Sequence, residues 1–319
     1  MALPELLCVM GPTAAGKTDL AIAIADHADC ELISVDSALV YKGMDIGTAK
    51  PDYPHHLVNI RDPAEPYSAA DFCRDARTLI DEIVARGRHP VLVGGTMLYF
   101  KALFDGLAEM PPADRVIREH LDAEAKDKGW PHLHKMLSDV DPELAATIHP
   151  NHSQRIGRAL EVYLASGKTM TQWRKQQLKS QGGSLREHYR LRQIAIRPAD
   201  RKDLHWRIEQ RVDAMFAAGL EDEVRSLYER GDLHRDLPAV RAVGYRQLWG
   251  YLEGEYDLPR ARELCVQATR QLAKRQLTWL RGWPDLLWLL TDGSGQALID
   301  APGLSPAQAA LKYLHRVTK

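Results

Sequence analysis

A stretch of eight residues near the N-terminus has the pattern of a phosphate-binding loop. It fits GxxxxGK followed by Ser or Thr in full, and its sequence is Gly11-Pro12-Thr13-Ala14-Ala15-Gly16-Lys17-Thr18. In such a loop, successive backbone N–H groups surround an anion at the N-terminus of a helix. The lysine reaches the outer phosphate, and the threonine hydroxyl can ligate Mg²⁺. The pattern predicts a site for a diphosphate group and does not by itself specify a nucleotide.

Asp36 is the next candidate, because it follows the predicted strand Glu31–Val35. We expect this strand to lie beside the first strand of a parallel sheet. Asp36 would then stand at the carboxyl edge of the sheet, where α/β folds bind ligands. A carboxylate at that place could hold Mg²⁺, act as a general base or only cap the following turn.

The segment Gly94-Gly95-Thr96 follows another predicted strand, Pro90–Val93. Its two glycines indicate either a close approach of the backbone to a ligand or only a tight turn, and Thr96 supplies a hydroxyl. A motor ATPase or GTPase would usually have Asp or Asp-Glu here, to hold the metal and position water. Because neither is present, we expect that something other than water attacks the phosphate-bearing group.

Three later segments are rich in arginine and are candidates for contact with nucleic acid. Arg155 and Arg158, within Gln154–Leu160, share one face of a predicted helix. Arg241–Arg246 has two arginines around a Gly-Tyr turn. Phosphate contacts would explain these patterns, and so would ordinary solvated faces.

The third segment has no acidic residue between Glu263 and Asp285. Arg270, Lys274 and Arg281 form one stripe of a helix there, and the same stretch contains Trp279 and Trp283. Such a stripe fits phosphate contacts with bases stacked on aromatic rings. It also fits an ordinary helix with buried tryptophans, and both interpretations stay open.

Short apolar runs alternate with helical stretches over the first hundred residues. The expected elements are strands at Leu6–Met10, Glu31–Val35 and Pro90–Val93, a short apolar run at Leu57–Ile60, and helices at Thr18–Ala28 and Ser68–Arg86. This alternation predicts a parallel sheet covered by helices.

The pattern changes near residue 111. Residues from about 115 to 180 are helical, lack strand signals and end at a break, Gln181-Gly182-Gly183-Ser184, and a strand follows at Leu191–Ile196. From Asp203 onward the chain is mostly helical, and Ser305-Pro306 opens a last helix. We therefore predict a P-loop NTPase-like α/β core over residues 1–114 and 191–319, with an all-helical insertion domain over residues 115–190.

Composition is that of an ordinary globular protein. Of 319 residues, 45% are hydrophobic and 27% charged, which excludes disordered and fibrous classes. Residues 1–114 have 9 Lys/Arg against 17 Asp/Glu, whereas residues 115–190 have 13 against 9 and residues 191–319 have 20 against 17. An acidic first third followed by basic segments hints at an anionic partner. The four scattered cysteines indicate reduced thiols of a cytoplasmic protein, and we see neither a signal peptide nor a membrane span.

Taken together, these segments resemble those of the bacterial tRNA dimethylallyltransferases, a tRNA isopentenyltransferase family with a P-loop fold. The resemblance runs through nearly the whole chain, in Gly11–Thr18, Asp36–Pro51, His55-His56-Leu57, Gly94–Thr96, Gln154–Leu160, Arg241–Arg246 and Lys274–Arg281. One departure is Ala15, where we expect Ser in many relatives. Because the anion site consists of backbone N–H groups, little should change.

The resemblance implies transfer of a dimethylallyl group from dimethylallyl diphosphate to N6 of the adenine immediately 3′ to a tRNA anticodon. It implies Mg²⁺ dependence, with Thr18 as the ligand, and diphosphate binding by Gly11–Thr18. Asp36, Thr96 and Arg211 would act at the reacting groups, with Asp36 as general base and Arg211 gripping the diphosphate. The implied tRNA contacts are Asp36, Ser37, Ala38, Leu39, Thr96, Arg118, Gln154, Arg155, Ile156, Gly157, Arg158, Arg241, Ala242, Val243, Gly244, Tyr245, Arg246, Lys274, Arg275, Gln276, Leu277, Thr278, Trp279, Leu280 and Arg281.

Other functions stay open at this point. A small-molecule P-loop kinase, a prenyltransferase acting on free adenylate and a non-catalytic RNA-binding module would each share part of the pattern. Since the sequence has no exposed heptad repeat, we expect a monomer. The anticodon stem-loop of tRNA is the expected macromolecular partner.

Overall fold

The computed structural model describes residues 3–108, 110–179, 184–298 and 305–317. The chain forms two compact units, Met1–Phe104 with His188–Lys319 and, between these segments, Asp105–Glu187. No helix in the described ranges is long and apolar enough to cross a membrane.

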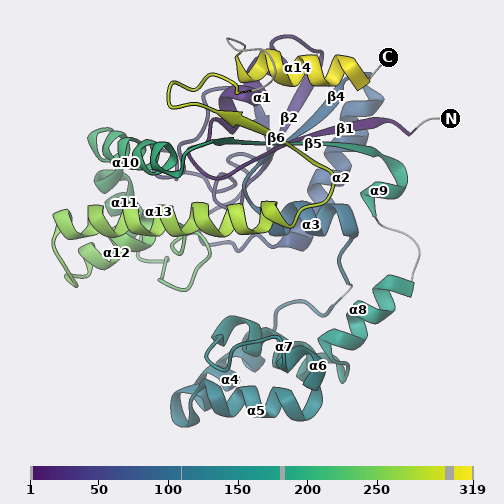
Figure 1. Cartoon of the computed structure of the whole chain (residues 1–319). Helices are drawn as coiled ribbons and strands as arrows, with labels where there is room; N and C mark the ends of the chain where they lie inside the picture. Colours follow the sequence, from purple (N-terminus) through teal and green to yellow (C-terminus); the bar gives the residue numbers. More distant parts are fainter. Residues whose placement is uncertain (1–2, 109, 180–183, 299–304, 318–319) are drawn as a thin grey trace. The chain divides into compact units, whose positions relative to one another are not determined.

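The first unit is built on a six-stranded, all-parallel sheet with the order β3-β2-β4-β1-β5-β6 (Figure 1). The strands are β1 (Glu5–Met10), β2 (Cys30–Val35), β3 (His55–His56), β4 (His89–Gly94), β5 (Arg190–Pro198) and β6 (Leu286–Thr291). The central strands are apolar along nearly their whole length, as strands covered on both faces must be. The predicted parallel sheet is confirmed.

Three details of the sheet differ from the expectation. Strand β4 lies between β1 and β2, so β2 is not beside the first strand. Strand β3 was not expected, and it directly precedes the apolar run Leu57–Ile60, whose backbone turns at Leu57 and Asn59, both with positive φ. Strand β6 was not expected, although Leu286–Thr291 is a short apolar run that begins two residues after Pro284.

Helices cover both faces of the sheet. In Figure 1, α1 and α14 lie above it, and α3 and α13 lie below it. The helices are α1 (Lys17–Ala25), α2 (Ala69–Ala85), α3 (Met97–Asp105), α9 (Leu185–His188), α10 (Arg201–Ala217), α11 (Leu220–Tyr228), α12 (Tyr245–Leu252), α13 (Leu258–Arg281) and α14 (Pro306–Val317).

Two of the predicted helix starts are confirmed by their caps. The Ser68 side chain accepts from the backbone N–H of Asp71, whose carboxylate accepts from the N–H of Ser68, so α2 begins with a capping box. At α14, Ser305 Oγ accepts from the N–H of Gln308, and Pro306 takes the first helical position.

The second unit is helical throughout the residues that the structure describes there. Its helices are α4 (Arg115–Lys128), α5 (Trp130–Val140), α6 (Pro142–Ala145), α7 (Ser153–Ser166) and α8 (Met170–Lys179). Leucines and isoleucines such as Leu121, Leu133 and Ile156 form its own core. The expected break at residues 181–183 lies outside the described residues.

Candidate active site

The phosphate loop leaves the end of β1 and enters α1. Gly11 is needed because a Cβ there would approach the backbone oxygen of Ile196 to 2.5 Å. Gly16, with φ 91°, is the N-cap of α1 and supplies no side-chain cap. The first N–H groups of α1 are therefore left for another partner, as an anion site requires.

Lys17 and Arg211 line one cavity of about 160 Å³ beside this loop, together with Thr18 and Asp36. Lys17 Nζ donates to the backbone oxygen of Pro12 at 2.7 Å. Burial, followed by the nearby positive charge of Arg211, lowers the pKa of Lys17 from 10.5 to about 8, while Asp36 acts to raise it. Burial also lowers the pKa of Arg211. Two desolvated cations in one cavity destabilise each other, and a bound anion would relieve that repulsion.

Asp36 stands directly after β2, at the carboxyl edge of the sheet. Its Oδ1 accepts from the N–H groups of Ala38 at 2.8 Å and Leu39 at 3.4 Å. The carboxylate thus caps the following turn, one of the three roles left open by the sequence. It also lines the cavity, so capping fixes its orientation without removing it from the site.

Thr96 lies beside Asp36 in space. Its Oγ accepts from the N–H of Ser37 at 3.1 Å, and its own N–H donates to the oxygen of Val35 at 3.2 Å. The structure therefore brings the ends of β2 and β4 together, so that Thr96 holds the backbone on both sides of Asp36.

The glycines at the end of β4 are required by close packing within the protein. A Cβ at Gly94 would come within 2.0 Å of the oxygen of Val35, and one at Gly95 within 2.3 Å of Gln276 Nε2. Gly94 also lines the cavity, so a close approach of its backbone to a ligand stays a prediction.

Gln276 connects two of the loops. Its Oε1 accepts from the N–H of Thr13 at 2.9 Å, and its Nε2 donates to the oxygen of Gly95 at 3.0 Å. The side chain is buried beside the cavity and does not lie on the outer face of α13. Gln276 thus positions the phosphate loop, and the implied tRNA contact at this position stays a prediction.

Glu223, which the sequence analysis missed, holds the segment that follows Asp36. Its carboxylate accepts from the N–H groups of Asp45, Ile46 and Gly47 at 2.7, 2.8 and 3.0 Å. It also accepts from the hydroxyl of Tyr245 at 2.5 Å, and burial together with this carboxylate raises the pKa of that hydroxyl. No local pattern marks Glu223, since the three backbone N–H groups that it accepts from are 176–178 positions away in the chain.

The segment Arg241–Arg246 reaches the same cavity. Ala242, Val243 and Gly244 line it, while Arg241 and Arg246 are exposed. Tyr245 is 1% exposed and packs against Gly47, where a Cβ would lie 2.6 Å from its ring. Its implied contact with tRNA is corrected, because the ring belongs to the core.

The C-terminal turns of α13 contain both exposed and buried side chains. Lys274, Arg275, Thr278, Trp279 and Arg281 are exposed, and Leu277 is half-buried. Leu280 is 1% exposed, so a side-chain contact with RNA at that position is excluded.

In the helical unit, Gln154 and Arg155 are exposed on α7, whereas Ile156 is fully buried and cannot contact RNA by its side chain. A Cβ at Gly157 would meet Trp130 at 3.5 Å, an ordinary contact, so this glycine packs against a neighbouring helix.

Arg118 and Arg158 both pair with Glu161, at 2.8 Å in each case. The Glu161 side chain is buried, and these two guanidiniums, against the opposing effect of burial, hold its pKa below the usual range. The pairing fixes both arginines while leaving the Arg118 side chain 54% exposed.

Comparison with known proteins agrees with this arrangement. A model of the family described as IPP transferase matches residues 39–283. A full-length tRNA isopentenylpyrophosphate transferase from Bacillus halodurans is 37% identical, with 98% of this chain and 95% of that chain covered and a TM-score of 0.66.

Two further solved structures are similar. A tRNA delta(2)-isopentenylpyrophosphate transferase from Staphylococcus epidermidis is 32% identical, with 99% of each chain covered and a TM-score of 0.65. A eukaryotic dimethylallyltransferase acting on tRNA is 26% identical, with 91% of this chain and 74% of that chain covered and a TM-score of 0.73.

Proposed function

The chain belongs to the IPP transferase family, and we propose that it transfers a dimethylallyl group from dimethylallyl diphosphate to N6 of the adenosine 3′ to the anticodon in tRNA. Its similarity to tRNA prenyltransferases makes it a transferase and sets aside the small-molecule kinase that a phosphate loop alone would allow. The observation that carries the proposal is one cavity in which Lys17 and Arg211 lie with the carboxylate of Asp36.

Diphosphate is the leaving group. As its C–O bond to the allylic carbon breaks, negative charge grows on the diphosphate oxygens. The uncapped N–H groups of α1, Lys17 and Arg211 stabilise that charge, and they do so strongly because the cations are already desolvated. Gln276 keeps the loop in place through Thr13.

The attacking atom is the exocyclic N6 of adenine. Asp36 accepts a hydrogen bond from this amino group and takes its proton as the new N6–C bond forms. The caps from Ala38 and Leu39 and the hydrogen bond between Thr96 and Ser37 hold the carboxylate in a single orientation. A stacked base could not enter such a site, so the adenosine must be flipped out of the anticodon loop.

Thr18 fits a Mg²⁺ site, since it lines the same cavity and has a hydroxyl oxygen. Magnesium is commonly held by one or two protein oxygens plus substrate phosphates. In the described part of the chain, no three His, Cys, Asp or Glu side chains gather into a metal site of their own, which suits an ion that arrives with the diphosphate. When bound, Mg²⁺ would neutralise part of the charge on the leaving group.

The RNA path in this proposal includes the exposed arginines of Arg241–Arg246, the outer face of α13, and Arg118, Gln154, Arg155 and Arg158 of the helical unit. We further expect a monomer located in the cytoplasm. Light scattering would test the oligomeric state. The basic character of the chain after residue 114 supports an anionic partner.

The test is an assay with dimethylallyl diphosphate, Mg²⁺ and an anticodon stem-loop RNA that has adenosine 3′ to the anticodon. We expect release of pyrophosphate and an RNA adenosine heavier by one prenyl group in mass spectra. A hairpin with guanosine at that position is the control, because guanine lacks an N6 amino group. Absence of prenylated adenosine, or prenylation of free AMP in preference to RNA, would overturn the proposal.

A further inference from the structure

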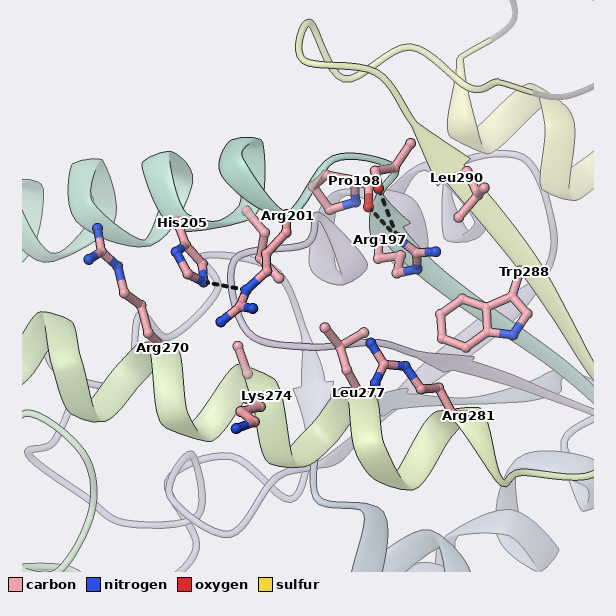
Figure 2. Close-up of a pocket in the computed structure, with 13 residues that line it drawn as sticks. Arg197, Pro198, Arg201, His205, Arg270, Lys274, Leu277, Arg281, Trp288 and Leu290 are labelled. Atoms are coloured by element: carbon pink, nitrogen blue, oxygen red, sulfur yellow. Dashed lines mark hydrogen bonds between the residues drawn. The ribbon is translucent and has the colours of Figure 1, made fainter.

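A second cavity of about 650 Å³ lies in the first unit and shares no lining residue with the cavity at the phosphate loop. It is formed by α10 and α13 together with the ends of β5 and β6 (Figure 2). Its volume falls within the range of small-molecule sites, about 300–1,000 Å³. Lys274, Leu277 and Arg281 of α13 belong both to this cavity and to the helix face included in the RNA path, whereas the residues from β5, β6 and α10 have no role in the function proposed above.

The cavity is strongly cationic. Arg197, Arg201, Arg270, Lys274 and Arg281 line it, and none of its lining residues is acidic. Arg270 pairs with Glu209 at 3.0 Å, whereas the side chains of Lys274 and Arg281 have no partner among the described residues. Several positive charges around one space repel each other, so an anion bound there would be favoured.

His205 lies among these cationic side chains. Its Nε2 is 3.2 Å from Nε of Arg201. Burial, then Arg270 and then Arg201, lower the pKa of its imidazole. The neutral ring therefore adds a polar group without adding to the charge.

One end of the cavity is aromatic and apolar. Figure 2 shows Trp288 with Arg197 and Arg281 at this end, and Arg201, His205 and Arg270 at the other. The guanidinium of Arg197 lies over the Trp288 ring, 5.4 Å from its centroid. Leu277 and Leu290 complete the apolar surface.

We propose that this cavity binds a nucleotide, with its base against Trp288 and Leu290 and its phosphate on Arg201, Lys274 and Arg270. An aromatic ring beside several arginines is the combination that recognises a base and its phosphate together, since every base has a face to stack and guanidinium matches phosphate oxygens. With five cationic side chains and no carboxylate in its lining, the cavity is suited to binding an anion. The inference does not depend on the function proposed for the first cavity.

The nucleotide could be free in solution or part of a bound RNA strand, and the experiment separates these sources. Saturating pyrophosphate first blocks the phosphate loop. AMP and ATP, and separately an anticodon stem-loop RNA, are then titrated by calorimetry into the wild-type chain and into the Arg201→Gln and Trp288→Leu variants. Arg260→Gln is the matched control, because Arg260 is an exposed arginine of α13 that pairs with Glu263 outside the cavity.

We expect each cavity variant to weaken nucleotide binding about tenfold, the loss that one charge-assisted contact or one stacked base accounts for. The control variant should leave it unchanged. If the cavity variants weaken only RNA binding, the site serves a nucleotide of the bound strand. If they weaken neither nucleotide nor RNA binding while pyrophosphate still binds each variant normally, the proposal is overturned. Loss of pyrophosphate binding would reveal a folding defect, and the conservative Arg201→Lys and Trp288→Phe variants would then decide the same question.

Discussion

The side-chain oxygen of Gln276 accepts a hydrogen bond from the backbone N–H of Thr13 at 2.9 Å, although the two residues are 263 positions apart. The same side chain donates to the oxygen of Gly95. One buried carboxamide in the C-terminal part of α13 therefore sets the distance between the phosphate loop and the loop after β4. The shape of the anion site depends on a helix from the C-terminal part of the chain.

Replacing Gln276 by Leu should weaken pyrophosphate binding and lower the free energy of unfolding by about 1–3 kcal/mol, because two buried backbone groups lose their partner. Calorimetry and thermal unfolding would measure the two effects. Gln271→Leu is the matched control, since Gln271 is exposed on the same helix. Equal losses in both variants would show that the hydrogen bonds of Gln276 are not responsible.

Replacing Asp36 by Asn should reduce turnover by about 10²–10⁴-fold, the usual contribution of a general base. The asparagine oxygen can still accept from Ala38 and Leu39, so the turn should persist. Pyrophosphate and RNA affinities should accordingly change little. Rapid-quench assays with saturating substrates would measure the chemical step. Near-normal turnover in this variant would exclude Asp36 as the base.

Local pattern was enough to predict much of this molecule. The phosphate loop between a strand and a helix, the strands and helices that build the parallel sheet, and the helix beginning near Ser68 have local sequence signals, and all three are confirmed. Strand order was wrong, since β4 separates β1 from β2 and the sequence has no local signal for that pairing. Glu223 and Gln276 could not be identified for the same reason, because their partners are distant in the chain.

The pH dependence of pyrophosphate binding should reveal the loss of the proton from Lys17. Its pKa is lowered to about 8 by burial and by Arg211, so the protonated, anion-binding form is lost as pH rises through 8. The contribution of Lys17 to affinity should then fall by up to about tenfold per pH unit. Because pyrophosphate also titrates, the measurement is the difference between the wild-type chain and Lys17→Arg, which stays charged. If the pyrophosphate affinities of the wild-type chain and of Lys17→Arg changed in parallel with pH, the lowered pKa of Lys17 would be contradicted.

The same shift affects stability in the absence of ligand. Lys17 in the unfolded chain keeps its proton up to about pH 10.5, whereas the folded chain releases it near pH 8. Between these values the unfolded state binds more protons, so this residue should make the free energy of unfolding rise with pH. Urea unfolding from pH 7.5 to 10 would measure the trend, and Lys17→Met should lack this component.

Replacing Glu223 by Ala should loosen the segment Asp45–Gly47, whose three N–H groups lose their acceptor. We expect faster hydrogen exchange there and reduced turnover, with pyrophosphate affinity nearly unchanged because the phosphate loop does not contact Glu223. Asp222→Ala, an exposed acidic neighbour on α11, is the control. Unaltered exchange at these three amides would mean that other contacts hold the segment.

Replacing Arg275 by Ala should weaken RNA binding and make it less sensitive to salt. Arg275 is exposed on α13, and its side chain has no partner among the described residues. A phosphate contact at this position should contribute about 0.7–0.9 to the slope of log affinity against log salt concentration, through release of one counterion. Titrations of a labelled anticodon stem-loop at several salt concentrations would measure the slope. Arg260→Ala should leave it unchanged, because Arg260 already pairs with Glu263. If both variants keep the wild-type slope, the RNA does not contact α13 through Arg275.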